Sequence, residues 1–246
     1  MPHIWFAVRD ATSCQTPHMA TSVLPLASPD RWLVSGDRSS RVGYAIDALV
    51  ASPRTTRLVA LDLDDSTGST GASFVTLEAT DPAVVGAADL FAMGLLGVPV
   101  SAAAARSLLS TATSRRIGQL LRSIPETTDL WAARTSTLEA AVRAGEELTA
   151  VADLGSVGAG ALLARKRPRL VPFLEEPAAR LLDLPRPSDP LDPDGWAALR
   201  FVLSDADRRA RIDALAPAGT PPEVTTLRLL DIAAWASASR GRSGRR

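Results

Sequence analysis

The chain has 246 residues, of which 46% are hydrophobic, so it can bury a sizeable core in one large domain or two small ones. Its 27 basic and 27 acidic residues give a formal net charge of zero, which excludes the strongly basic balance of a dedicated nucleic-acid binder. A single cysteine, Cys14, and two N-terminal histidines, His3 and His18, exclude an internal disulfide, a cysteine-rich zinc site and a histidine-based centre in the body of the chain.

The sequence shows no segment typical of membrane insertion or export. No apolar run reaches the roughly 18 residues that a membrane-spanning helix needs. The N-terminus also lacks the basic-then-apolar order of a signal peptide. We therefore expect a cytoplasmic protein without a membrane partner, and we expect no metal ion and no cofactor.

Residues 1–38 are predicted to be poorly ordered. Residues 1–18 hold both histidines and the cysteine, show no apolar periodicity, and are followed by a second plausible start at Met19. We expect residues 1–18 to add nothing to stability, either as an over-extended start or as a disordered tail.

Helical periodicity begins at residue 39. Residues 39–51 place Val42, Ile46 and Leu49 on one helical face. Residues 57–63 (R-L-V-A-L-D-L) are compatible with a strand or a short helix. The polar stretch that follows them (D-D-S-T-G-S-T-G-A-S) is a loop by composition.

From Asp81 onward the pattern is helical. Gly97 is a C-cap candidate for a helix over 87–97, and Ser101 is an N-cap candidate for the next helix. Pro168 ends a helix over 158–167. Further helices are predicted at 114–123, 135–152, 174–184 and 196–203, around Ile212 and Leu215, and at 223–239.

Trp131, Trp196 and Trp235 lie at helical spacing with other apolar residues, which predicts that they are core residues. The whole pattern predicts an all-α fold. It consists of one helical domain over residues 39–239, an irregular N-terminal region, and a short basic tail over residues 240–246.

The stretch L-V-A-L-D-L-D-D-S-T (58–67) resembles the first motif of haloacid dehalogenase-like phosphatases, which implies Asp62 as nucleophile and Asp64 as acid/base. That fold requires alternating strands and helices, which the rest of this chain does not show. The carboxylates also resemble half of a calcium loop, but its twelfth position is Ser73 where a glutamate is needed. A polar loop is the favoured interpretation.

The stretch L-G-S-V-G-A-G-A (154–161) is similar to the turn of helix-hairpin-helix proteins. In that motif, backbone N–H groups at a helix start point at a DNA phosphate. Val157 and Gly158 would form the turn here, while Ser156 replaces its first glycine. The alternative is an ordinary turn between two helices.

Four cations follow within five positions: Arg165, Lys166, Arg167 and Arg169. Such a run can bind phosphates as a local basic patch for nucleic acid. The alternative is a solvated helix end, where cations complement the negative end of the helix dipole.

The segment L-L-A-R-K-R-P-R-L-V-P (162–172) resembles the signature of an uncharacterised actinobacterial family, known only as a domain of unknown function. T-G-A-S-F-V-T-L, A-A-D-L-F-A-M-G-L-L-G-V-P-V and L-R-L-L-D-I-A-A-W resemble further segments of the same family. The resemblance runs from about residue 68 to 238. It implies an all-α fold and no particular activity.

That family in turn resembles, distantly, the helix-hairpin-helix DNA glycosylases. The resemblance implies a helix-hairpin-helix-like arrangement and places Glu175 where those enzymes carry a catalytic aspartate. The longer side chain counts against excision chemistry, because a misplacement of about an ångström can cost ~100-fold in rate. Gly160 stands where some glycosylases carry a lysine.

Three functions therefore remain open. The first is a non-catalytic module that binds nucleic acid through Val157, Gly158 and the four cations. The second is a structural or protein-interaction domain in which the cations stabilise the fold. The third is a degenerate glycosylase-like enzyme that uses Glu175.

Overall fold

The structure is a computed structural model and describes residues 36–64, Phe74, Leu77 and residues 81–243. All regular elements in these described ranges are helices, and they form a single domain, which confirms the all-α prediction. Their bounds are α1 Gly36–Val50, α2 Pro53–Leu63, α4 Ala87–Leu95, α5 Ala102–Leu109, α6 Thr111–Arg122, the 3-10 helix η3 Leu130–Ala132, α7 Thr135–Thr149, α8 Gly155–Lys166, α9 Glu176–Leu181, α10 Pro193–Val202, α11 Ala206–Asp213 and α12 Thr226–Ser243.

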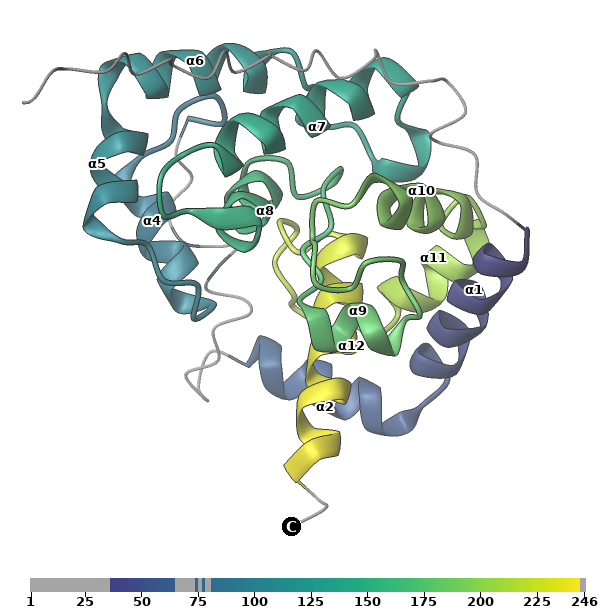
Figure 1. The fold of residues 1–246 in the computed structure, drawn as a ribbon. Coiled ribbons are helices and arrows are strands. Elements are labelled where there is room, and N and C mark those ends of the chain that lie inside the picture. Colours follow the sequence, from purple (N-terminus) through teal and green to yellow (C-terminus); the bar gives the residue numbers. More distant parts are fainter. Residues whose placement is uncertain (1–35, 65–73, 75–76, 78–80, 244–246) are drawn as a thin grey trace, which may run out of the picture.

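The helices form two groups (Figure 1). In the first group α7 packs on α6 and α8, and α8 also packs on α4. In the second group the N-terminal helices α1 and α2 return to the C-terminal helices, with α2 against α12 and α1 against α10. Asp47 of α1 accepts a 2.9 Å hydrogen bond from Arg208 of α11, which fixes this return. One continuous core spans both groups.

The segment 167–175 joins α8 to α9 and touches both groups. Arg167 donates to the Leu121 carbonyl at the end of α6, and the Phe173 N–H donates to Asp231 of α12 at 3.2 Å. The Thr225 hydroxyl, just before α12, donates to the Pro168 carbonyl at 2.8 Å. These bonds hold an irregular segment between two helical groups.

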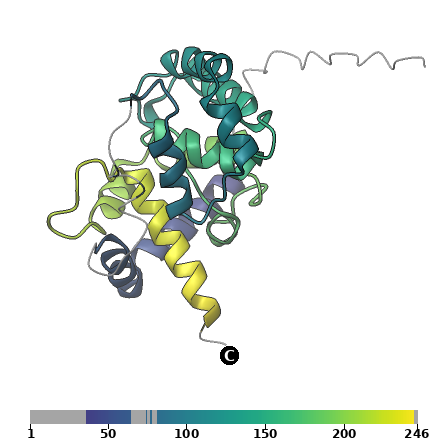
Figure 2. The same ribbon diagram turned by 90° about the vertical axis from the view of Figure 1, so that its left-hand side faces the viewer.

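Helix α12 is the longest element near this segment. Figure 2 shows its C-terminal end extending beyond the other helices. Its buried residues lie between Leu227 and Ala236, and the helix packs against α2, α9 and α11. No described helix is long and apolar enough to span a bilayer.

Several predicted boundaries differ from the structure. Helix α1 begins at Gly36, inside the segment predicted to be poorly ordered, and α12 continues to Ser243, into the predicted basic tail. Residues 1–35 and 244–246 lie outside the described residues. Residues 57–63 belong to helix α2, so Asp62 does not follow a strand as the phosphatase motif requires.

Candidate functional site

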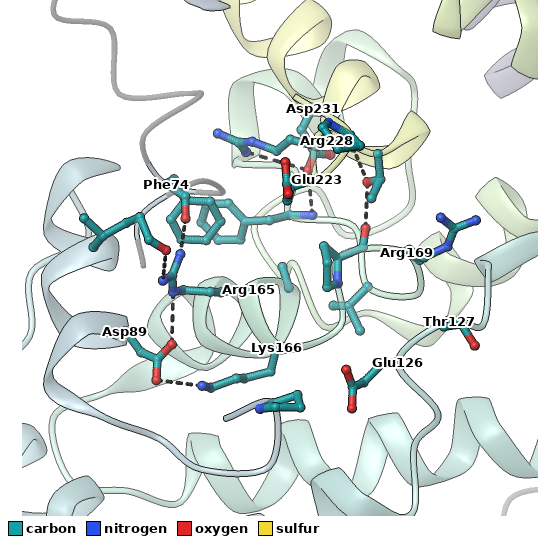
Figure 3. Close-up of a pocket in the computed structure, with 18 residues that line it drawn as sticks. Phe74, Asp89, Glu126, Thr127, Arg165, Lys166, Arg169, Glu223, Arg228 and Asp231 are labelled. Atoms are coloured by element: carbon teal, nitrogen blue, oxygen red, sulfur yellow. Dashed lines mark hydrogen bonds and ion pairs between the residues drawn. The ribbon is translucent and has the colours of Figure 1, made fainter. Parts of the chain in front are cut away.

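The predicted basic cluster lies at the end of α8 and is largely buried. Asp89 of α4 lies 3.0 Å from Arg165 Nε and 2.7 Å from Lys166 Nζ, and all three side chains are buried (Figure 3). Arg165 also donates to the Phe74 and Leu77 carbonyls. Desolvation lowers the pKa of Lys166, while the Asp89 carboxylate acts in the opposite direction. These contacts join α4 and α8 to each other and to Phe74 and Leu77.

Arg167 is deeper still, with 2% of the residue exposed. Its guanidinium donates to the Leu121 carbonyl in the last turn of α6. It also donates, at 2.7 Å, to the Ile124 carbonyl just beyond the end of that helix. It also donates to the Pro82 carbonyl at 2.9 Å. Desolvation lowers the pKa of this guanidinium. The cation therefore supplies donors to the Ile124 and Pro82 carbonyls outside α6, and it adds a further donor to the Leu121 carbonyl, which also accepts from the Ile124 N–H.

Arg169 is the exposed member of the cluster, with 46% of its side chain accessible, and it pairs with Asp129 at 2.8 Å. Figure 3 shows it pointing away from the Arg165–Lys166–Asp89 group. The expected solvent-facing basic patch is thus not formed by these four residues. The reason is tertiary: the end of α8 is enclosed by α4 and by the end of α6, which supply oxygen partners.

Val157 and Gly158, the residues predicted to form the hairpin turn, belong to helix α8 instead. Helix α8 already begins at Gly155, which has φ of +67°, so Val157 and Gly158 lie in its first turn. The chain reverses just before, where Asp153 has φ of 63°. A Cβ on Gly158 would lie 2.7 Å from Leu154 Cδ1, so this glycine permits close packing.

A cavity of about 390 Å³ opens between α8, α12 and the segment 167–175 (Figure 3). Much of its wall is apolar, from Phe74, Pro168, Val171 and Phe173 among others. The charged lining residues are Asp89, Glu126, Arg165, Lys166, Arg169, Glu223, Arg228 and Asp231. Of the predicted site residues, Arg165, Lys166 and Arg169 therefore meet at this cavity.

Asp231 of α12 is the least expected group in this wall. Its side chain is 7% exposed, and Arg228 Nη1 lies 3.9 Å away. One carboxyl oxygen accepts from the Phe173 N–H, while Oδ1 has no hydrogen-bond partner among the described residues. Burial raises the pKa of Asp231 to about 8, and the Glu175 carboxylate adds to this rise. Near neutral pH the carboxyl group is therefore mostly protonated.

Glu175 lies on the other side of Phe173. It lines a smaller cavity of about 50 Å³ together with Asp62, Leu96, Phe173, Arg228, Asp231, Ile232 and Trp235. Burial raises the pKa of Glu175, opposed by a hydrogen bond from the Trp235 side chain and by the Arg228 charge. Phe173, Arg228 and Asp231 line both cavities, so the two adjoin.

Glu175 also shares a shallower hollow of about 300 Å³ with Val157. The structure thus brings these two predicted residues together, away from the four cations. The predicted core position of Trp235 is wrong, because 40% of it is exposed on the α12 face that borders the small cavity. Trp196 is buried as predicted.

Sequence analysis missed Arg228 and Asp231. Together with Trp235 they stand at i, i+3 and i+7 in the otherwise apolar stretch 227–236 of α12, so they share one face. Charged residues on the apolar face of a helix are a usable signal. The guanidinium groups of Arg228 and Arg165 lie 5.2 Å and 5.8 Å from the centroid of the Phe74 ring. No helical pattern in the sequence could have indicated this contribution of Phe74 to the site.

The acidic groups of these cavities do not form a metal centre. Within the described ranges, no group of three or more histidine, cysteine, aspartate or glutamate side chains is arranged to hold a metal ion. What the arrangement offers is one buried and one half-buried carboxyl group, Asp231 and Glu175, with raised pKa values, beside a guanidinium and aromatic rings.

One family model matches residues 55–238, and its description is a family of unknown function (DUF6308). The match spans α2 to α12 and includes every residue that lines the two adjoining cavities. It begins earlier than the predicted start near residue 68. Searches of curated proteins and of solved structures gave no match. The actinobacterial origin and the helix-hairpin-helix resemblance stay predictions.

Proposed function

The chain belongs to DUF6308, a family of unknown function, and we propose from its cavities that the domain is a binding module for a small organic molecule. The ligand occupies the cavity between α8, α12 and the segment 167–175. The observation that carries this proposal is a cavity of about 390 Å³ lined by Asp231, a residue whose buried Oδ1 has no hydrogen-bond partner among the described residues.

The size and lining support this proposal. Small-molecule sites are usually concave, of about 300–1,000 Å³, mostly apolar, with a few polar groups that orient the ligand. This cavity lies at the lower end of that range and has apolar walls around Phe74, Val171 and Phe173. Buried polar atoms are normally hydrogen-bonded, so an unsatisfied carboxyl oxygen in a cavity wall suits a ligand donor.

A nucleic-acid role has weaker support. A phosphate backbone is bound by accessible cations. Here Arg165, Lys166 and Arg167 are buried, and their partners are Asp89 and main-chain oxygens. The same contacts favour the alternative in which the cations of residues 165–169 stabilise the fold. We propose that these cations stabilise the junction of α4, α6 and α8 and so shape one wall of the cavity.

The test is a fragment screen of the whole chain by ¹H–¹⁵N correlation NMR. We expect hits whose chemical-shift changes cluster at Phe173, Asp231 and Trp235. The variant Ala164→Leu extends a side chain from the cavity wall and should abolish these shifts. Ala210→Leu makes the same change at an exposed site on α11 and should leave them intact. A screen without hits at these residues would refute the proposal.

A further inference from the structure

Arg228 is the only described cation that lines the small cavity, and it is surrounded by carboxyl groups. Asp231 comes from α12, Glu175 from the segment before α9, and Asp62 from α2. All three act electrostatically on the Arg228 guanidinium. Among the described residues the cavity thus joins one guanidinium to three carboxyl groups from three separate elements.

We infer that this small cavity receives the ammonium group of a primary amine whose apolar body lies in the larger cavity. The inference rests on the proposed function, because it assigns the chemical class of the ligand in the same site. It makes Asp231 and Glu175 the groups that recognise the cation.

The charge balance favours a cation. A buried carboxylate without sufficient counter-charge is costly and tends to take up a proton instead. Asp231 shows this behaviour, since burial and the nearby Glu175 both favour its neutral form. An ammonium group placed beside Asp231 would take over the role of that proton.

The hydrogen-bonding capacity also fits. An ammonium group has three donors and no acceptor. Asp231 Oδ1 is buried and has no hydrogen-bond partner in the described part of the chain, so it offers an acceptor. Phe173 and Trp235 line the same cavity, and aromatic faces attract cations.

The two volumes match the two parts of such a ligand. The small cavity of about 50 Å³ is close to the space of one or two water molecules, each about 30 Å³ in the liquid. It can hold a group of the size of an ammonium ion. The larger cavity, of about 390 Å³ with apolar walls, has room for a hydrocarbon or aromatic body.

An anionic ligand fits less well. The described residues that line the two adjoining cavities include six acidic and four basic side chains. Three of those cations, Arg165, Lys166 and Arg169, already pair with Asp89 or Asp129. A carboxylate or phosphate would therefore approach Asp231 and Glu175 with only Arg228 in its favour.

The test compares three probes of similar shape by isothermal titration calorimetry: 2-phenylethylamine, 2-phenylethanol and 3-phenylpropionate. We expect the amine to bind at least about tenfold more tightly than either of the others, because only the amine supplies a cation. The Trp235 indole N–H, which hydrogen-bonds Glu175, is the NMR reporter for the small cavity.

The pH dependence gives a second readout. The amine requires ionised Asp231, so its affinity should rise about tenfold from pH 6 to pH 7 and level off above pH 8, as the ionised fraction does. The charged groups that act on Asp231 are Arg228 from its own helix and Glu175 from the segment before α9. Asp62 of α2 lines the same cavity. A ligand that accepts a hydrogen bond from the protonated Asp231 carboxyl would show the opposite slope.

Asp231→Asn keeps the shape and removes the charge, so it should weaken amine binding at least tenfold and remove the rise with pH. Glu175→Gln is the second variant and should weaken binding without removing the rise. Glu146→Gln, on the exposed face of α7, is the matched control and should bind like the parent. The NMR spectrum of each variant verifies its fold.

Three results would overturn this inference. The first is binding of the alcohol or the carboxylate as tight as that of the amine. The second is amine affinity that falls with pH, and the third is a folded Asp231→Asn protein that binds the amine normally. Each leaves the proposed function standing if fragments still bind at Phe173. An absence of binding by all three probes and by the fragment screen would refute both.

Discussion

Arg167 illustrates at the scale of one residue how a buried cation can be held by main-chain carbonyls. Its guanidinium donates to the Leu121, Ile124 and Pro82 carbonyls, and the first two lie at the end of α6. A helix C-terminus carries partial negative charge and unsatisfied carbonyls. A planar guanidinium with five donors can satisfy several of them at once.

Replacing Arg167 with methionine keeps much of the side-chain volume but removes the guanidinium donors of the Ile124 and Pro82 carbonyls, while the Leu121 carbonyl still accepts from the Ile124 N–H. We expect it to lower the free energy of unfolding by about 3 kcal/mol, because each buried unsatisfied group costs about 1–3 kcal/mol. Arg169→Met is the control and should cost less than about 1 kcal/mol, since its ion pair is largely exposed. Urea denaturation measures both, and equal losses would show that the buried carbonyls are unimportant.

Asp231 predicts a pH dependence of stability. Its pKa is about 8 in the fold and about 4 in an unfolded chain. The folded state therefore holds a proton that the unfolded state has lost between those values. The contribution of this proton to stability is fully present below about pH 4 and is lost progressively as the pH rises to about 8.

Asp231→Asn removes this titration. From about pH 5 to about pH 8, the unfolding free energy of Asp231→Asn should therefore rise relative to that of the parent. Urea titrations at several pH values in this window measure it. Parallel pH profiles for the two proteins would contradict the raised pKa.

At the scale of one element, α8 is packed by small residues. Gly158, Ala159, Gly160 and Ala161 are buried, and α7 and α4 lie against the helix. A Cβ on Gly160 would lie 2.9 Å from Pro190 Cγ, which belongs to a rigid ring. The absence of a side chain here lets the segment before α10 lie directly on α8.

Gly160→Ala should therefore lower stability by about 1–3 kcal/mol through overpacking, even though alanine favours helix by about 1 kcal/mol. Gly94→Ala, in α4, is the matched control, because no atom lies within 4 Å of its added Cβ. That variant should gain up to about 1 kcal/mol. Thermal unfolding by circular dichroism compares them, and a stable Gly160→Ala protein would mean that Pro190 moves aside.

At the scale of the whole molecule, charge and fold work against association with nucleic acid. The chain has no net charge, and Arg165, Lys166 and Arg167 are buried between α4, α6 and α8. Long-range attraction of a polyanion depends on an accessible excess of positive charge.

We therefore expect no measurable binding to duplex DNA, single-stranded DNA or RNA in fluorescence anisotropy at about 100 mM salt. Four cations on phosphates would instead give a slope of log K against log salt near −3 to −4. Such a slope, together with loss of binding in Arg169→Ala, would restore the nucleic-acid function.

The sequence by itself determined the helical class and many element ends. Helical periodicity and capping arise between residues three or four apart, so they can be read locally. Ser101 does cap α5, its hydroxyl accepting from the Ala104 N–H at 3.0 Å, and Gly97 follows α4 with a positive φ. Family membership could likewise be recognised from local motifs.

Only the tertiary structure decided which charged groups face solvent and which face a cavity. Arg165 and Lys166 are buried because Asp89 reaches them from another helix. Asp231 and Asp62 meet because α12 packs on α2, although the two residues lie far apart in the sequence. Desolvation and pKa depend on such packing, which no local pattern encodes, and so the candidate site could not be found before the helices were placed together.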